Sequence, residues 1–275
     1  MIAKDLPGER KWPDKKPPTV VLTRPLGPNE GGDTLRERLL QDGFIVDSFP
    51  VLKIEPLPLD EAGKQLVRAL ATGGPHWIAW LSPTSVYVTR DLLKSLSGTA
   101  VIHPSIRAAV QGPGTAKALN DCFQRNADLV PPVFVAEEFA DFLCDTISQS
   151  ESILLFQAAD GRNLVAPILS ARGRIVHTLS TYQTVPLEPR PELSERFIEV
   201  GAKDLIFVFM SPSAVVATAA GFNHRPSFLR NVTVVTIGPT TSSAARAAGC
   251  LHVFEAETHS EEGVFERVKL FLSRC

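Results

Sequence analysis

The sequence lacks a strong excess of charge of either sign. Its 275 residues carry 28 Lys and Arg against 30 Asp and Glu, so the formal net charge is −2. A chain with so small a net charge has no global basic field that would attract nucleic acid or an anionic membrane. We therefore expect neither partner, and any site for an anion must be local.

The sequence also lacks the spacings of a metal or redox site. The six histidines are scattered, and none of the four cysteines stands in a CxxC pair. Reduced, incidental thiols in a cytoplasm are the simplest interpretation. We expect no bound metal and no disulfide framework. The cysteines are Cys122, Cys144, Cys250 and Cys275.

Long apolar runs are missing as well. No run is as long as a membrane span, and the charged, Pro-rich residues 1–18 have no apolar core of the kind a signal peptide needs. We expect residues 1–18 to form a flexible extension and the protein to be cytoplasmic.

What the sequence does have is a repeated order of short apolar runs and amphipathic stretches. The β-branched run 19–23 is typical of a buried parallel strand, 33–43 has its leucines on one helical face, and 44–49 is a second strand. Alternating strands and helices predict an α/β fold with parallel sheets flanked by helices. The same order of strand, helix and strand returns at 152–156, 162–173 and 174–179.

A Pro-rich segment follows the second strand of each half, at 50–59 and at 182–193. Such segments make semi-rigid connectors. One interpretation is a single long doubly wound sheet. We favour two similar domains joined by two crossing linkers, with a cleft between them. Domain 1 is then split, 19–53 plus 183–275, and domain 2 is inserted, 54–182.

A Ser-Pro phrase follows a strand in each half, as SPTSV from Ser82 and as SPSAV from Ser211. Ser at an N-cap with Pro at the first helical position is a helix-start signal, and one interpretation makes both serines caps and nothing more. The other uses their position. Ligands bind at the carboxyl ends of strands in open α/β sheets, and a helix start there offers free N–H groups to an anion.

A Gly-Pro turn occurs at the same place in each half, in GPGTA and GPTTS. Gly112 and Gly238 let the backbone approach a ligand closely, while Thr115 and Thr241 can cap the helix or donate to an anion. The phrases lack the GxGxxG pattern and the Walker lysine, so they support a nucleotide site weakly. Four helix starts, two per domain, would suit a polyanion if they face one another across the cleft.

Three further side chains stand at strand or helix ends. Arg24 follows the first strand and can bind a carboxylate through two parallel N–H bonds, or it is a surface arginine. Arg162 holds the corresponding position in the second half. Tyr182 follows a strand and opens the second linker, where its phenol can donate a proton or simply pack the linker.

Taken together and in order, these phrases resemble the uroporphyrinogen-III synthase family from Thr19 onward. The resemblance implies two α/β domains joined by two crossing strands, with the active site in the cleft. It implies an enzyme that closes hydroxymethylbilane into uroporphyrinogen III without cofactor or metal. The phrases are VVLTRP, WIAWLSPTSV, AAVQGPGTAKAL, STYQT, LIFVFMSPSAV, VTIGPTTSSAARAAG and SEEGVFERV.

The resemblance also implies a mechanism and roles. The substrate carries an acetate and a propionate on every ring, loses its terminal hydroxyl as water, and closes through a spiro intermediate with the last ring inverted. Tyr182 is the candidate catalytic residue for hydroxyl departure. A transient partner would be the upstream hydroxymethylbilane synthase, and the alternative function is a non-catalytic two-domain protein that binds an anion or tetrapyrrole. The expected substrate-binding residues are Arg24, Ser82, Gly112, Thr115, Arg162, Ser211, Gly238, Thr240 and Thr241.

Overall fold

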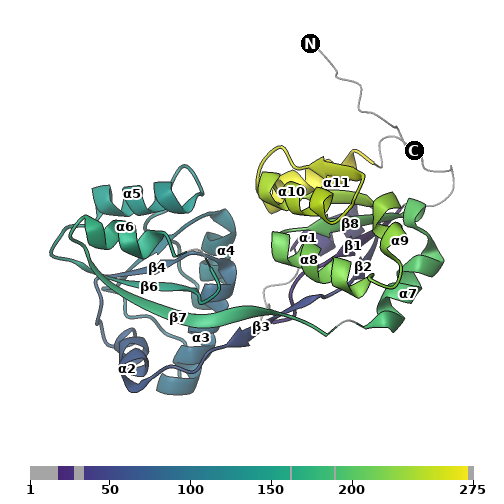
Figure 1. Cartoon of the computed structure of the whole chain (residues 1–275). Coiled ribbons are helices and arrows are strands. Elements are labelled where there is room, and N and C mark those ends of the chain that lie inside the picture. Colours follow the sequence, from purple (N-terminus) through teal and green to yellow (C-terminus); the bar gives the residue numbers. More distant parts are fainter. Residues whose placement is uncertain (1–17, 28–33, 162, 189, 272–275) are drawn as a thin grey trace, which may run out of the picture. The chain divides into compact units, whose positions relative to one another are not determined.

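Two five-stranded sheets organise the part of the chain that the computed structural model describes, residues 18–27, 34–161, 163–188 and 190–271 (Figure 1). Residues 1–17 of the expected extension and the candidate Arg162 lie outside these residues. The prediction of an α/β fold with parallel sheets flanked by helices is confirmed, and the sheets observed are mostly parallel. No helix in the described ranges is long and apolar enough to cross a membrane.

The described residues form two compact units. Unit 1 comprises 18–26, 34–53, 186–188 and 190–271, and unit 2 comprises 27, 54–161 and 163–185. The chain passes from unit 1 to unit 2 within β3 (Leu52–Pro56) and returns near the end of β7 (Ile175–Pro186). Unit 2 is therefore inserted into the sequence of unit 1.

The sheet of unit 1 is entirely parallel and has the order β10-β9-β8-β1-β2. The interior strand β1 pairs on one side with β2 and on the other with β8, which is remote in the sequence. The residues of β8, LIFVF, are all buried, as expected for a strand covered on both faces. The strands are β1 (Thr19–Leu22), β2 (Ile45–Ser48), β8 (Leu205–Phe209), β9 (Thr233–Thr236) and β10 (His252–Glu255).

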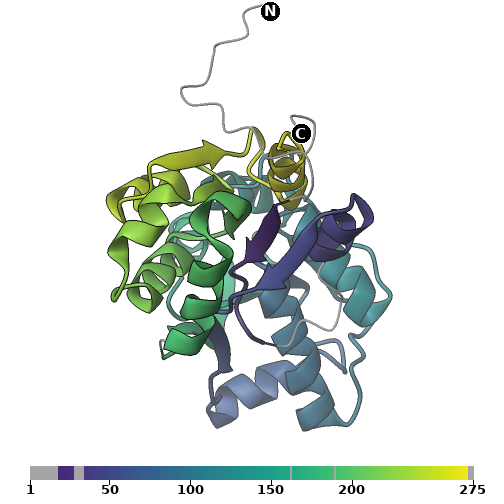
Figure 2. The same cartoon turned by 90° about the vertical axis from the view of Figure 1, so that its right-hand side faces the viewer.

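Helices cover both faces of this sheet (Figure 2). One face packs against α1 (Thr34–Gln41) and α11 (Glu261–Lys269). The other face packs against α7 (Pro191–Val200), α8 (Pro212–Gly221), α9 (Pro226–Asn231) and α10 (Pro239–Ala247). A 3-10 turn, Ala202–Asp204, connects α7 to β8.

An aromatic cluster fills the core beneath α7 to α9. The ring of Phe207 meets those of Phe49, Phe197 and Phe222 edge-on, with centroids 6.2, 5.8 and 6.0 Å away. Edge-to-face pairs add to the stabilisation that burial provides. Phe207 therefore joins a strand, a helix and two connecting segments in one core.

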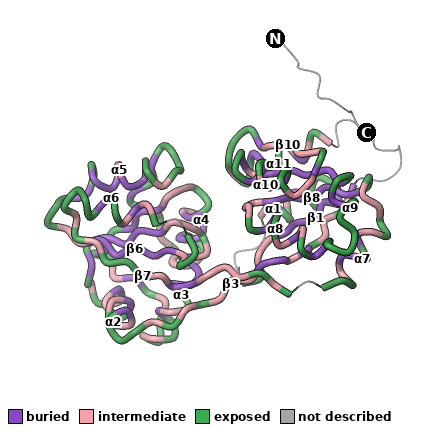
Figure 3. Tube along the Cα trace, viewed as in Figure 1, coloured by how far each residue is buried: buried purple, intermediate pink, exposed green. Residues whose placement is uncertain are grey.

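In unit 2 the sheet order is β3-β7-β6-β4-β5. β4, β5, β6 and β7 are parallel, whereas β3 and β7 run antiparallel, since Leu57 N donates to Thr181 O and Leu187 N donates to Val51 O. Figure 3 shows the buried central strand β6. The remaining strands are β4 (Trp77–Trp80), β5 (Arg107–Val110) and β6 (Ser152–Ala158).

Five helices flank this second sheet. The core on one face is built with residues of α2 (Glu61–Ala69), α3 (Pro83–Ser97) and α4 (Pro113–Phe123). The opposite face packs against α5 (Ala136–Thr146) and α6 (Val165–Ala171). α3 and α4 follow β4 and β5 directly, so both begin at the carboxyl edge of the sheet.

The Pro-rich segments differ from the expectation of simple connectors, because both contain paired strand. Pro50 precedes β3, while Pro56 and Pro186 are the last residues of β3 and β7. At those positions the missing N–H interrupts no ladder. Pro167 lies in the first turn of α6, where proline is tolerated.

The aromatic cluster predicts a large packing effect. We expect Phe207→Ala to lower the free energy of unfolding by about 3–5 kcal/mol, because it leaves a cavity between three buried rings. Urea denaturation followed by far-ultraviolet circular dichroism measures the change. The control is Val216→Ala on the outer face of α8, where the side chain is 65% exposed and the expected change is within about 0.5 kcal/mol. Equal losses in the two variants would contradict the prediction.

Candidate active site

A β-bulge sets the direction of Tyr182. The register pairs Gln157 of β6 with Ser180 of β7 but pairs the next residue, Ala158, with Tyr182. Thr181 is therefore an extra residue in β7. Side chains alternate between faces, and Leu179 lies on the face of α2, α3 and α4, so strict alternation would send Tyr182 to the opposite face. The extra residue restores it to the face of α3.

The phenol of Tyr182 meets the start of α3. Its Oη lies 2.8 Å from Oγ of Ser82, the N-cap residue. Ser82 Oγ already accepts the backbone N–H of Ser85 at 3.1 Å, and its own proton remains for donation. With Ser82 as donor, the phenol oxygen accepts and the phenol proton is available to a ligand. Ser82 therefore caps α3 and also contacts the phenol of Tyr182.

Burial determines the protonation state of Tyr182. The residue is 5% exposed, and loss of solvation raises the pKa of its phenol above the ordinary value of 10. The nearby charge of Asp160 raises this pKa further, while hydrogen bonds to Ser82 and Thr84 lower it. At neutral pH the phenol therefore keeps its proton and can act as a donor or as an acid.

The start of α4 lies beside the start of α3. A Cβ added at Gly114 would come within 3.7 Å of Pro83 Cγ, so the two first turns are neighbours. Gly112 is the N-cap of α4 and provides no side-chain cap, which leaves backbone N–H groups for another acceptor. Thr115 is buried, and its backbone N donates to Gly112 O at 3.1 Å.

Unit 1 contains a matching pair of helix starts. Ser211 caps α8, where its Oγ accepts Ala214 N at 3.2 Å. Gly238 is the N-cap of α10 without a side-chain bond, and in the first turn Thr240 is exposed while Thr241 is buried. These helices follow β8 and β9, which are paired in parallel.

Arg24 lies after β1 in unit 1. Its Nη2 donates to Oε1 of Glu261 at 2.8 Å, in the first turn of α11. A substrate carboxylate at Arg24 would therefore share the guanidinium with Glu261 or replace it. Within the described ranges, Tyr182, Ser82 and Gly112 belong to unit 2, whereas Arg24, Ser211 and Gly238 belong to unit 1.

Several residues near these positions were not found from the sequence. Thr84 and Asp160 both influence the phenol of Tyr182, and Asp160 Oδ1 accepts the backbone N–H of Thr184 at 3.1 Å. In unit 1 the ring of His259 packs on Gly238, since an added Cβ there would lie 3.1 Å from the His259 Cδ2. The phrase DG after Ala159 marks a turn, but nothing in the sequence aims Asp160 at a tyrosine.

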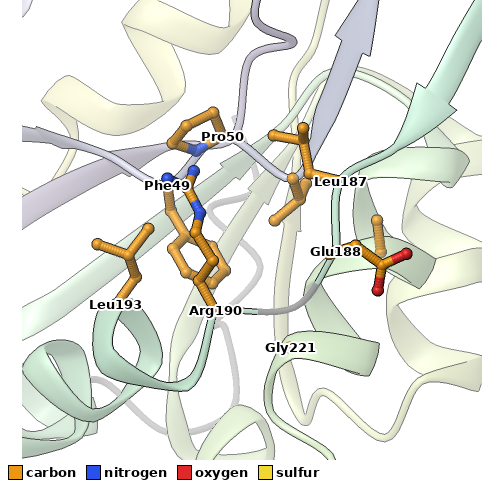
Figure 4. Close-up of a pocket in the computed structure, with 9 residues that line it drawn as sticks. Phe49, Pro50, Leu187, Glu188, Arg190, Leu193 and Gly221 are labelled. Atoms are coloured by element: carbon orange, nitrogen blue, oxygen red, sulfur yellow. The ribbon is translucent and has the colours of Figure 1, made fainter.

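A pocket in unit 1 is lined by other residues (Figure 4). It forms where the segment before β3 passes the segment after β7, with Glu188 and Arg190 at its side. No residue of the expected site lines it, so we do not assign it to the reaction. Its lining residues are Phe49, Pro50, Val51, Leu187, Glu188, Arg190, Leu193, Ala217 and Gly221. In the described part of the chain, no cluster of three His, Cys, Asp or Glu residues could hold a metal.

Comparison with known proteins decides the family. The family model described as Uroporphyrinogen-III synthase HemD matches residues 33–266. The chain belongs to the uroporphyrinogen-III synthase family. Members of this family are cyclising lyases that act on hydroxymethylbilane in tetrapyrrole biosynthesis.

Individual relatives agree with the family model. The Porphyrin biosynthesis protein HemD of Ruminiclostridium josui is 26% identical over 238 residues, which cover 86% of this chain and 45% of that protein. The chain thus spans less than half the length of that relative. A putative uroporphyrinogen-III synthase of Methanocaldococcus jannaschii is 25% identical over 260 residues, covering 93% of this chain and 99% of the relative.

A solved structure shows the same fold. The crystal structure of uroporphyrinogen-III synthetase from Helicobacter pylori superposes with a TM-score of 0.57 at 20% identity, covering 93% of this chain and 99% of the other. At 20% identity this likeness shows the fold alone.

The protonation of Tyr182 is directly measurable, because the chain has two tyrosines, Tyr87 and Tyr182. We expect Tyr87→Phe to leave one phenolate absorbance that titrates above pH 10, since burial raises the pKa of Tyr182. The stability linked to the neutral phenol is complete below pH 10 and is lost as pH rises through the folded-state pKa. A midpoint at or below 10 in this variant would show that the phenol is not buried as described.

Ser82→Ala tests the hydrogen bond to the phenol. The bond to Ser82 lowers the pKa of Tyr182, so its removal is expected to raise that pKa further. Loss of the cap is also expected to cost about 1 kcal/mol of stability. Ser260→Ala is the matched control, because Ser260 caps α11 by accepting Gly263 N at 3.1 Å. It should lose similar stability without shifting the phenol titration; identical titrations in the two variants would refute the assignment.

Proposed function

We propose that this chain converts hydroxymethylbilane into uroporphyrinogen III and that Tyr182 protonates the departing hydroxyl. The observation that carries the proposal is a buried phenol, neutral at pH 7, bound at 2.8 Å to the N-cap serine of α3. Family membership supports the reaction, and the bulge at Thr181 supports the choice of residue because it directs this side chain to the helix start.

The chemical role of Tyr182 follows from the first step. As the C–O bond of the terminal hydroxymethyl group breaks, the phenol proton goes to the hydroxyl, which leaves as water. The pyrrole nitrogen lone pair supplies electrons to the exocyclic carbon, and the ring becomes cationic. The phenolate is left at Tyr182, where a hydrogen bond donated by Ser82 would stabilise it.

The remaining steps need positioning more than acid or base strength. The substituted carbon of the last ring attacks the electrophilic carbon and forms the spiro intermediate, which opens and closes again with that ring inverted. The final loss of a ring proton restores the phenol at Tyr182. Holding a flexible chain in the pose that forms the spiro centre can supply much of the barrier reduction.

The substrate carboxylates require donors. In unit 2 the uncapped start of α4 at Gly112 offers backbone N–H groups and the positive end of a helix dipole. We also propose that Thr115 and Arg162 bind substrate carboxylates. In unit 1 the proposed carboxylate-binding residues are Arg24, Ser211, Gly238, Thr240 and Thr241.

We also propose that the reaction uses no cofactor, receives its substrate from the upstream synthase and takes place in the cytoplasm. The reaction as written exchanges only protons and C–O or C–C bonds, so the proposed steps use no cofactor. Hydroxymethylbilane closes spontaneously to the type I isomer, so a short transfer from the upstream synthase would be advantageous. We propose that synthase as a transient partner, in the cytoplasm.

A coupled isomer assay tests the function. Hydroxymethylbilane is generated in place, the product is oxidised, and the type I and type III isomers are separated by chromatography. We expect type III from the wild-type protein, and we expect Tyr182→Phe to lower kcat by about 10²–10⁴-fold through loss of the acid. Tyr87→Phe is the control and should keep wild-type kcat, because Tyr87 lies on α3 and packs into the core of unit 2.

Two results would contradict this proposal. Only the type I isomer in the presence of folded wild-type protein would exclude the synthase activity and favour a protein that binds a tetrapyrrole without turnover. Type III formation by Tyr182→Phe at the wild-type rate would exclude the acid role while leaving the reaction in place.

A further inference from the structure

Two buried polar atoms without a hydrogen-bond partner lie at the bulge that precedes Tyr182. Gln157 Oε1 and Thr181 Oγ1 are both inaccessible and accept or donate no hydrogen bond within the described residues. Gln157 is the residue before the register shift, and Thr181 is the extra residue itself. Buried polar groups are nearly always paired, so two unpaired ones at a single point require an explanation.

Packing does not explain why positions 157 and 181 hold polar side chains. Gln157 follows the apolar run ILLF in β6 and is 9% exposed, so an apolar side chain would suit the same surroundings. Thr181 is fully buried and makes its strand contact through its backbone, whose O accepts Leu57 N at 2.9 Å. Valine has nearly the shape of threonine and would leave no unpaired hydroxyl.

The position of Gln157 is that of a ligand contact. β6 extends past β4, whose last residue, Trp80, pairs with Phe156, so Gln157 lies at the carboxyl edge of the sheet. Ligands of open α/β sheets bind over this edge. Gln157 follows the face of α5 and α6 while Tyr182 follows that of α3, so a ring lying across the edge can contact both. The terminal torsion of glutamine is soft, which lets its oxygen turn toward such a ring.

The chemistry of the amide oxygen selects the group that binds it. An amide oxygen only accepts, so the carboxylates of the substrate cannot pair with it, whereas a pyrrole N–H can. In a hydroxymethylpyrrole the N–H and the hydroxymethyl group stand on adjacent ring atoms. A hydroxyl at Tyr182 therefore places that N–H close by.

We propose that Gln157, with Thr181 as a second polar contact, completes the substrate site at Tyr182 by accepting the N–H of the pyrrole that loses the hydroxyl. This inference rests on the proposed function. As the C–O bond breaks, the ring becomes cationic and its N–H more acidic, so the hydrogen bond to Gln157 strengthens in the transition state. Gln157 thereby acts on kcat more than on KM.

Three substitutions test the proposal in the isomer assay. Gln157→Met and Thr181→Val remove the polar atoms at similar size. Thr218→Val in α8 is the matched control, because Thr218 is also fully buried with an unpaired Oγ1, but belongs to unit 1. We expect Gln157→Met to lower kcat at least about tenfold, with a smaller change in KM. Thr181→Val should lower kcat less, and Thr218→Val should keep wild-type values.

Thermal unfolding of the same variants separates a substrate contact from a structural one. All three should melt at or above the wild-type temperature, because each removes an unpaired buried polar atom. Wild-type kcat in Gln157→Met, or a fall in its melting temperature that accompanies the loss of kcat, would overturn the inference alone. A folded wild-type protein that makes only the type I isomer would overturn the proposed function and this inference with it.

Discussion

The pairing of β6 with β7 shifts by one residue at Thr181, and the direction of the Tyr182 side chain depends on that shift. Without it Tyr182 would lie on the face of α5 and α6, away from the cap of α3. The shift also lets one residue, Ser82, serve two purposes, since its hydroxyl accepts from the helix backbone and still has a proton for the phenol. A local defect in a ladder thus sets the direction, burial and protonation of one side chain.

The two units have the same pair of helix starts. In each, one helix begins with Ser-Pro and a side-chain cap, and its neighbour begins with Gly-Pro and none. The capped start is rigid and internally satisfied, whereas the uncapped one leaves N–H groups unpaired. In each unit, a capped helix start and a helix start with unpaired backbone N–H groups therefore lie at the same edge of the sheet.

Local signals in the sequence predicted most of the fold. Ser82 and Ser211 located two helix starts because capping acts over three or four residues. Local signals in the Pro-rich segments indicated only connectors, since β3 is held by β7, far away in the sequence, and strands there were expected only from the family resemblance. The bulge at Thr181 was missed for the same reason. For the candidate site, the sequence identified residue types at strand ends, but it could not show that Arg24 meets Glu261, and the substrate roles stay predictions.

The position of β1 between β2 and β8 has a consequence for synthesis on the ribosome. β1 emerges first, yet one of its two partners, β8, is translated only after the whole of unit 2. All five strands of the unit 2 sheet lie between β3 and β7 in the sequence, so this sheet can close while the chain is still growing. The apolar residues Val20 and Val21, fully buried in the finished sheet, must wait for β8. Translation thus creates an interval in which chaperones have a defined strand to protect.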